Sequence, residues 1–390
     1  MMKSKLILYS FFSLLFVTVC CAGWAKLKFS SEYVQTAAPA SPIPFQSNLR
    51  QNSVDSDISP PYKIIWETGV KSMVPDQPLA FDQYLVYTLK NGNIGFLDTR
   101  TGKVMAENRI APAFEHAPVI DKYTVFYAAN LGKETLVSFN LLELRKNWSV
   151  NLPHIYTTPL MWKNYIYVGS KDGSFFAVDK MSGETQWQYR ANASLFGTPA
   201  EQNGKIFFCD VKGSVYCIDG LTGELQWRTE LLPNIYGGPA LSNQQVFIGN
   251  TAGILYALEA TSGKILWETA TGGSIYSNIA LKENMLYVGN NSNKMLAINA
   301  RDGQIIWEFQ TKGIINSAPL VGKNFLYFGA WDKNVYILSR YSGELIQKIE
   351  FKRPVKSSPL LYENKLFLHV ANDHFYGIGT VDSPSGGVKR

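Results

Sequence analysis

The chain has 390 residues, of which 46% are hydrophobic, enough for one large domain or two of ordinary size. Its 37 Lys and Arg and 31 Asp and Glu give a formal net charge of +6, scattered along the whole sequence. Scattered charge lacks the basic patch or stripe of a nucleic-acid-binding protein, so we expect no nucleic-acid partner.

The first 25 residues predict an export signal or a membrane anchor. Lys3 and Lys5 precede an apolar run over residues 6–19, and small residues follow it. Simple cleavage is one outcome, and retention as an anchor is another, because residues 6–25 just suffice to span a bilayer. Lipid attachment at Cys20 or Cys21 is a third, although neither cysteine follows the small residue that usually precedes such a site. In each case the rest of the chain is expected outside the cytoplasm.

Residues 26–60 are rich in Ser, Pro, Gln and Asn and lack periodic apolar positions, so we predict a flexible tether there. Residues 381–390 are expected to form a disordered tail. The folded domain is therefore predicted to span residues 61–380.

A repeat of 40 residues fills that domain. Glycines and tryptophans keep its step, the former at Gly183, Gly223, Gly263, Gly303 and Gly343, the latter four positions later at Trp187, Trp227, Trp267 and Trp307. One unit is interpreted as a short inner strand ending at Pro199, strands over 205–209 and 214–219, and an outer strand over 224–228. Short alternating strands, regular turn glycines and this period are typical of β-propeller blades.

The irregular ends of the repeat give the number of blades. Gly102 with Ala106 marks a first unit that lacks its Trp, and Leu144 with Trp148 marks a second that lacks its Gly. Gln347 takes the Trp position of the seventh unit. The last unit, residues 357–379, supplies three strands only, and residues 63–66 supply the missing outer one. The predicted fold is all-β, an eight-bladed β-propeller of four-stranded antiparallel blades, closed by pairing of an N-terminal strand with the last blade.

The repeated residues are predicted to have structural roles. Asp98, Asp179 and Asp219 each begin a turn whose glycine, four residues later, takes a positive φ. A second glycine series, at Gly169, Gly249, Gly289 and Gly329, is expected where neighbouring blades approach closely. The tryptophans are expected to pack between blades, with the indole N–H bonded to backbone.

Cysteines and histidines give no sign of a reactive centre. If hairpin partners sum to 425, Cys209 and Cys217 point to opposite faces and form no disulfide. His369 and His374 flank a turn, but no third ligand recurs nearby, so we predict no metal. No nucleotide-binding loop, nucleophile elbow or zinc-protease pattern occurs, so we expect no catalytic residues.

The repeat resembles that of quinoprotein-type propellers, whose units carry PQQ-like repeats. The resemblance rests on residues 167–173, 177–179 and 182–184 with Trp187, and it covers residues 61–379. That superfamily holds dehydrogenases that use pyrroloquinoline quinone and the non-enzymatic BamB family of outer-membrane assembly lipoproteins. The dehydrogenases are much longer, bind calcium and quinone through inserted polar residues and often stack the quinone on a disulfide of adjacent cysteines. Here the adjacent pair is Cys20–Cys21 and the units carry no insertion, so we expect no cofactor and no enzyme.

The resemblance to the BamB family implies a membrane-attached scaffold on the periplasmic side of a bacterial envelope, favoured as an outer-membrane lipoprotein. Its protein partner would belong to a barrel-assembly complex, and the propeller would be monomeric. Partner binding in that family uses loops between one blade's outer strand and the next blade's inner strand. The equivalent residues here, 151–158 and 191–197, lack the Arg and Asp expected there. A quinoprotein-like ligand-binding or oxidoreductase domain, and a tethered propeller for adhesion or sensing, remain the alternatives.

These loops carry a periodic aromatic position, three residues before the inner-strand proline or its equivalent Ile279. It is occupied by Tyr156, Phe196, Tyr236 and Tyr276. Repetition predicts that these side chains share one face around the channel mouth, where they either anchor a protein partner or cap the blade cores. The same position further round holds Asn316 and Lys356. Lys356, with Lys352 and Arg353, either favours an acidic partner or forms a solvated loop.

Overall fold

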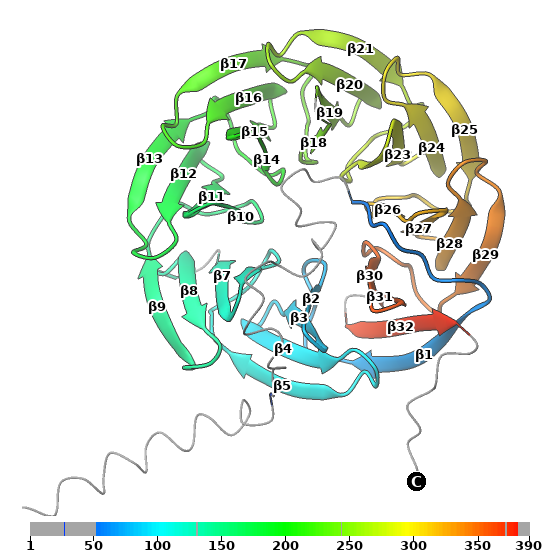
Figure 1. Ribbon diagram of the computed structural model, residues 1–390, viewed down its shortest axis with the longest axis horizontal. Coiled ribbons are helices and arrows are strands. Elements are labelled where there is room, and N and C mark those ends of the chain that lie inside the picture. The colour runs from blue at the N-terminus through cyan, green and yellow to red at the C-terminus, as the bar shows by residue number, and fades with distance from the viewer. Residues whose placement is uncertain (1–26, 28–51, 130–131, 243, 371–372, 381–390) are drawn as a thin grey trace, which may run out of the picture.

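The computed structural model describes residues 27, 52–129, 132–242, 244–370 and 373–380 (Figure 1). The signal with Cys20 and Cys21, almost all of residues 26–51 and the tail 381–390 lie outside the described residues. Within the described part, no helix is long and apolar enough to cross a membrane.

Eight four-stranded antiparallel sheets stand around a central axis, which confirms the predicted propeller (Figure 1). In blades 1 to 7 the strands run from the inside outward in chain order. The first four blades are β2 (Leu79–Phe81), β3 (Tyr84–Thr88), β4 (Asn93–Asp98) and β5 (Val104–Arg109); β6 (Val119–Asp121), β7 (Thr124–Ala128), β8 (Leu136–Asn140) and β9 (Arg145–Val150); β10 (Leu160–Trp162), β11 (Tyr165–Gly169), β12 (Ser174–Asp179) and β13 (Thr185–Arg190); and β14 (Ala200–Gln202), β15 (Lys205–Cys209), β16 (Ser214–Asp219) and β17 (Leu225–Glu230).

The remaining blades continue the ring. They are β18 (Ala240–Leu241), β19 (Gln245–Gly249), β20 (Ile254–Glu259) and β21 (Ile265–Ala270); β22 (Ala280–Lys282), β23 (Met285–Gly289), β24 (Lys294–Asn299) and β25 (Ile305–Gln310); β26 (Leu320–Val321), β27 (Phe325–Gly329), β28 (Asn334–Ser339) and β29 (Leu345–Glu350); and, in blade 8, β30 (Leu360–Tyr362), β31 (Lys365–Val370), β32 (His374–Thr380) and β1 (Tyr62–Gly69). The inner strand of blade 4 begins after Pro199, so the prediction that it ends there was wrong. Proline lacks the N–H that a strand interior needs, and the strand starts at the next residue.

Blade 8 joins the two ends of the folded chain. β1 runs antiparallel to β32, from Tyr62 opposite Thr380 to Gly69 opposite His374, with a bulge between Ile64 and Trp66. The predicted closure by an N-terminal strand is confirmed. Because β1 is the outermost strand of this blade, the ring is locked by a full sheet ladder.

Each tryptophan of the repeat packs against the turn of the following blade, as predicted. A Cβ placed on Gly223, whose φ is +75°, would lie 2.7 Å from Cδ2 of Trp187. Trp187 Nε1 also donates a hydrogen bond to Gly220 O at 3.1 Å. The same arrangement recurs around the ring, with Trp66 on Gly102, Trp148 on Gly183, Trp227 on Gly263, Trp267 on Gly303 and Trp307 on Gly343. The indole therefore fills the space that the glycine leaves and links neighbouring blades.

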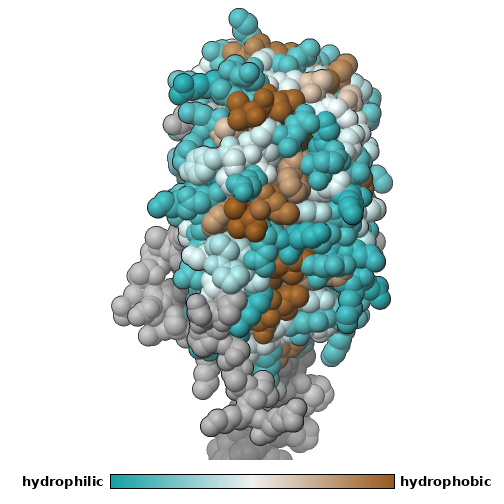
Figure 2. Space-filling view, turned by 90° about the vertical axis from the view of Figure 1, so that its right-hand side faces the viewer, coloured by the Kyte–Doolittle hydropathy of each residue, from teal (hydrophilic) through white to brown (hydrophobic). Residues whose placement is uncertain are grey.

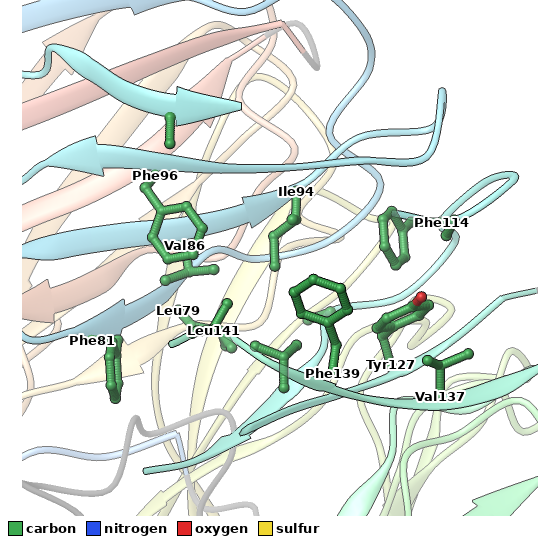
Figure 3. Close-up of a cluster of buried hydrophobic side chains, with 14 of the residues drawn as sticks. Leu79, Phe81, Val86, Ile94, Phe96, Phe114, Tyr127, Val137, Phe139 and Leu141 are labelled. Atoms are coloured by element: carbon green, nitrogen blue, oxygen red, sulfur yellow. The ribbon is translucent and has the colours of Figure 1, made fainter. Parts of the chain in front are cut away.

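The apolar core lies between neighbouring sheets. Between blades 1 and 2, Val86 and Phe96 face Tyr127 and Phe139, while Phe114 closes the cluster from the chain between the blades (Figure 3). Middle strands are buried on both sides, whereas outer strands such as β13 alternate between exposed and half-buried residues. Burial on both faces is what the repeated runs of Val, Phe, Tyr and Ile encode.

The two domain cysteines are free and buried, as expected, but the geometric reason given for it was wrong. Cys209 lies opposite Val215 and Phe207 lies opposite Cys217, so partner numbers sum to 424 and both thiols lie in one buried cluster. They are diagonal neighbours, for which Cα atoms stand roughly 7–8 Å apart. A disulfide needs a shorter separation.

Residues 52–58, assigned by composition to the tether, pack against the propeller. Val54 N donates to Val321 O at 2.9 Å, and Ser53 forms a parallel bridge with Val321. The Asp57 carboxylate accepts hydrogen bonds from Asn324 N at 2.6 Å and Asn324 Nδ2 at 2.9 Å. We call residues 52–58 the strap. It crosses blade 7 before β1 begins (Figure 1).

Candidate functional site: an aromatic arc on the linker face

The propeller has two faces of different construction. One, the linker face, is formed by the chain between each outer strand and the next inner strand, such as residues 191–199, and by the turns between the second and third strands. The other, the hairpin face, is formed by the turns between the first and second strands and between the third and fourth, such as residues 180–184. All of the partner-binding residues predicted from the sequence lie on the linker face.

A buried aliphatic residue fixes each linker. Leu195 is 1% exposed, its N–H donates to Ser170 O at 3.1 Å, and its Cβ lies 2.9 Å from where a Cβ on Gly169 would be. The predicted close approach at the second glycine series is thus confirmed, with the linker as the neighbour. The equivalent anchors are Ile155, Ile235, Ile275, Ile315 and Val355, all at most 1% exposed. Each site residue follows such an anchor directly, which turns its side chain outward.

The four predicted aromatic side chains form a continuous arc. Ring centroids lie 5.2 Å apart for Tyr156 and Phe196, 6.0 Å for Phe196 and Tyr236, and 5.8 Å for Tyr236 and Tyr276. Tyr236 and Tyr276 are 41% and 43% exposed, while the other two are half-buried. The preceding anchors, not these rings, belong to the buried clusters between blades. The arc is therefore a surface of its own and does not cap the blade cores.

His116 extends the arc by one ring, which sequence reasoning missed. Its ring lies 6.4 Å from that of Tyr156, and burial lowers its pKa below the ordinary value. In the register of the repeat the arc position of this blade falls on Glu115, so the 40-residue spacing gave no signal for His116. Lys171 adds a charge nearby, since its Nζ stands 5.6 Å from the Tyr156 ring centroid.

Lys356 lies at the opposite side of the linker face, on an aromatic support. Its Nζ is 4.1 Å from the centroid of Trp331, a residue of the turn after β27 that is 39% exposed. Lys352 and Arg353 are exposed beside it, and Asn316 is half-exposed. The face is therefore aromatic over blades 3 to 6 and basic near blade 8. Trp331 belongs to no periodic series, so the repeat did not point to it.

The titratable groups of the domain interior are shifted toward their neutral forms. Burial lowers the pKa of His369 to about 4 and raises that of the Cys217 thiol to about 12. Burial also raises the pKa of Cys209. Among the described residues, no three His, Cys, Asp or Glu side chains gather as a metal site would require. His374 instead contacts the Asp373 carboxylate through Nδ1 at 2.8 Å.

Residues 63–189 and 211–360, together well over half of the chain, match the family described as outer membrane protein assembly factor BamB. The chain belongs to this family. Its fold resembles the crystal structure of BamB from Moraxella catarrhalis, with a TM-score of 0.67 and 16% identity over 82% of this chain and 99% of that one.

Other propellers of the same shape have different activities. A europium-containing methanol dehydrogenase matches with a TM-score of 0.74 and 9% identity, over 90% of this chain and all of that one. The quinohemoprotein alcohol dehydrogenase of Comamonas testosteroni matches at 0.73 and 11% identity, over 94% and 84%. At these identities the likeness shows the fold alone. A search of curated proteins gave no match.

Proposed function

We propose that this BamB-family propeller is a non-catalytic scaffold on the periplasmic side of an outer membrane. It binds a protein partner of the barrel-assembly machinery through its linker face. The observation that carries this proposal is the unbroken arc of rings from His116 to Tyr276, exposed at the Tyr236 and Tyr276 end.

The chemistry of the arc suits protein recognition. Aromatic side chains bury large areas at low cost in side-chain entropy, and tyrosine adds a hydroxyl for a directional bond. Because neighbouring rings support one another at 5.2–6.0 Å, little ordering remains when a partner binds. The basic sector around Lys356 would attract an acidic segment of the same partner and set its orientation.

The scaffold role is proposed as non-catalytic for a separate reason. The units from residue 160 to residue 350 keep one length, so no blade carries an inserted loop that could enclose a quinone. The groups that could act as nucleophiles, Cys209 and Cys217, are buried with raised pKa values and have little thiolate at neutral pH.

The test is capture of native complexes by crosslinking, comparing the wild-type chain with the Tyr236→Ala/Tyr276→Ala double variant. Loss of two anchors of this type is expected to weaken binding at least about 30-fold, since a hot-spot residue contributes about 2 kcal/mol or more. Leu232→Ala is the matched control, because Leu232 is 54% exposed on the same face but outside the arc.

Two results would contradict the proposal. Recovery of partners that include no barrel-assembly component would remove the assembly role. An equal loss of binding in the Leu232 control would remove the arc as the docking surface.

A further inference from the structure

The most exposed apolar side chains of the described chain lie on the hairpin face, opposite the arc. Four of the five with the largest exposed fractions occupy the tips of turns between third and fourth strands: Met181 at 77%, Leu142 and Tyr341 at 58%, and Leu221 at 48%. The fifth, Leu232, lies on the linker face. A turn tip requires only Gly or polar chemistry, so these side chains have no role in forming the turn.

The same edge of the disc carries apolar residues on every blade. Twelve of the 17 exposed large hydrophobic residues lie at these turns or in the first residues of an outer strand. From blade 1 to blade 8 they are Val104, Leu142, Met181, Leu221 with Leu225, Ile265 with Leu266, Ile306, Tyr341 with Leu345 and Ile346, and Ile64. We call these twelve residues the apolar ring.

The ring is divided into separate points. Figure 2 looks onto the rim around β25, where brown apolar patches alternate with hydrophilic surface. Beside Leu142, Glu143 pairs with Arg145 at 2.6 Å, and beside Met181, Lys180 pairs with Asp121 at 2.6 Å. Charges at these tips are thus neutralised pairwise, so the ring has no strong electrostatic preference.

A groove next to Leu221 has the composition of a membrane–water interface. It measures about 550 Å³ and is lined by Trp162, Lys163 and Leu221 among others. Lys163 Nζ lies 4.5 Å from the Trp162 ring centroid. An aromatic ring with a long cationic side chain above apolar tips is the arrangement that interfacial segments use.

The N-terminal part of the chain reaches the propeller on this same face. The strap contacts residues at the hairpin-face ends of blades 6 and 7, where Lys282 Nζ donates to Val54 O at 2.8 Å and Asn324 N donates to Asp57. Fifty-one residues precede Asn52, and they include the apolar run of the signal or anchor. A membrane attachment through that segment would hold the hairpin face toward the bilayer.

We propose that the apolar ring of the hairpin face rests on a lipid surface, with the tips of blades 2, 3, 4 and 7 inserted at the headgroup boundary. Separate tips around a circle fit a planar, deformable layer, whereas a protein partner would need a matching socket for each tip. Because the adjacent charges are paired, the contact does not require anionic lipid. The arc on the linker face then points away from the membrane, toward a protein partner.

The test places a photoreactive p-benzoylphenylalanine at residue 181 of the full chain, in vesicles of phosphatidylethanolamine alone and mixed with phosphatidylglycerol. Mass spectrometry of the crosslinked peptide locates the adduct, so attachment through residues 1–51 does not confuse the result. We expect lipid adducts at residue 181 at least about tenfold above those at residue 232, with similar yield in both vesicles, because partitioning is apolar. The change L142D/L221D should reduce the yield at residue 181 severalfold.

Equal yields at residues 181 and 232, no lipid adduct at 181, or an adduct of 181 with protein would each overturn the lipid contact. Partner capture through the arc is measured separately on the opposite face. Failure of one proposal is therefore distinguishable from failure of the other.

Discussion

The contact between tryptophan and the glycine of the next blade predicts the cost of a single methyl group. In Gly223→Ala, the new Cβ must adopt a φ of +75° and lies 2.7 Å from the Trp187 indole. A left-handed backbone costs a non-glycine residue about 1–2 kcal/mol, and overpacking against a fixed ring adds about 1–3 kcal/mol. We expect the free energy of unfolding to fall by about 3 kcal/mol.

Gly272→Ala isolates the backbone part of this cost. Gly272 has a φ of +74° and nothing within 4 Å of an added Cβ, so only the loss of about 1–2 kcal/mol is expected. In a Trp187→Ala background the ring is gone, and Gly223→Ala should cost no more than Gly272→Ala does. Urea unfolding of the four proteins of this cycle, with Gly272→Ala alongside, measures both terms. The reasoning fails if Gly223→Ala and Gly272→Ala cost the same in the wild-type background.

Two further predictions concern pH and ligands. His369 has a folded pKa of about 4, below its ordinary 6.5, so the unfolded chain takes up a proton that the folded chain does not. Stability from this group is complete above about pH 6.5 and is lost as the pH falls toward 4, about 2 kcal/mol of it between pH 7 and 5. His369→Gly, which installs the residue found at Gly169 and Gly329, should flatten the stability difference between those two pH values, and an unchanged difference would refute the assignment. Pyrroloquinoline quinone with Ca²⁺ is expected to leave the melting temperature unchanged. A specific ligand at 100 times its dissociation constant would add about 2.7 kcal/mol, so a clear upward shift would restore the enzymatic alternative.

The number of blades could be predicted because the repeat carries its own neighbour contacts. A tryptophan is useful only where the next blade presents a glycine at the turn. Ala106 lacks the ring because the next turn holds Leu144 instead of glycine. Blade 8 has no such turn, since its two outer strands come from opposite ends of the chain, and there Gln347 replaces tryptophan. Gln347 Nε2 donates to Tyr62 O at 2.8 Å, and its Oε1 accepts from Tyr62 N at 2.9 Å, which ties blade 7 to the closing strand.

The errors lie where contacts are not periodic. The placement of Cys209 and Cys217 depended on a hairpin register, and one residue of difference exchanges the two faces of a strand. The strap is held by Asp57 against Asn324, a contact between residues 267 apart that no local pattern announces. Four members of the arc repeat every 40 residues and were found, whereas His116 and Trp331 reach the linker face from positions outside that spacing.

The shared last blade also determines the order of assembly. β1 is among the first parts of the folded domain to be synthesised, and its partner β32 is the last. Until the C-terminal strand arrives, β1 presents an unpaired edge that other chains could join. A product truncated before residue 374 would have seven complete sheets and no lock. The joint therefore works as a test of completeness, passed only by a chain that has been made to its end.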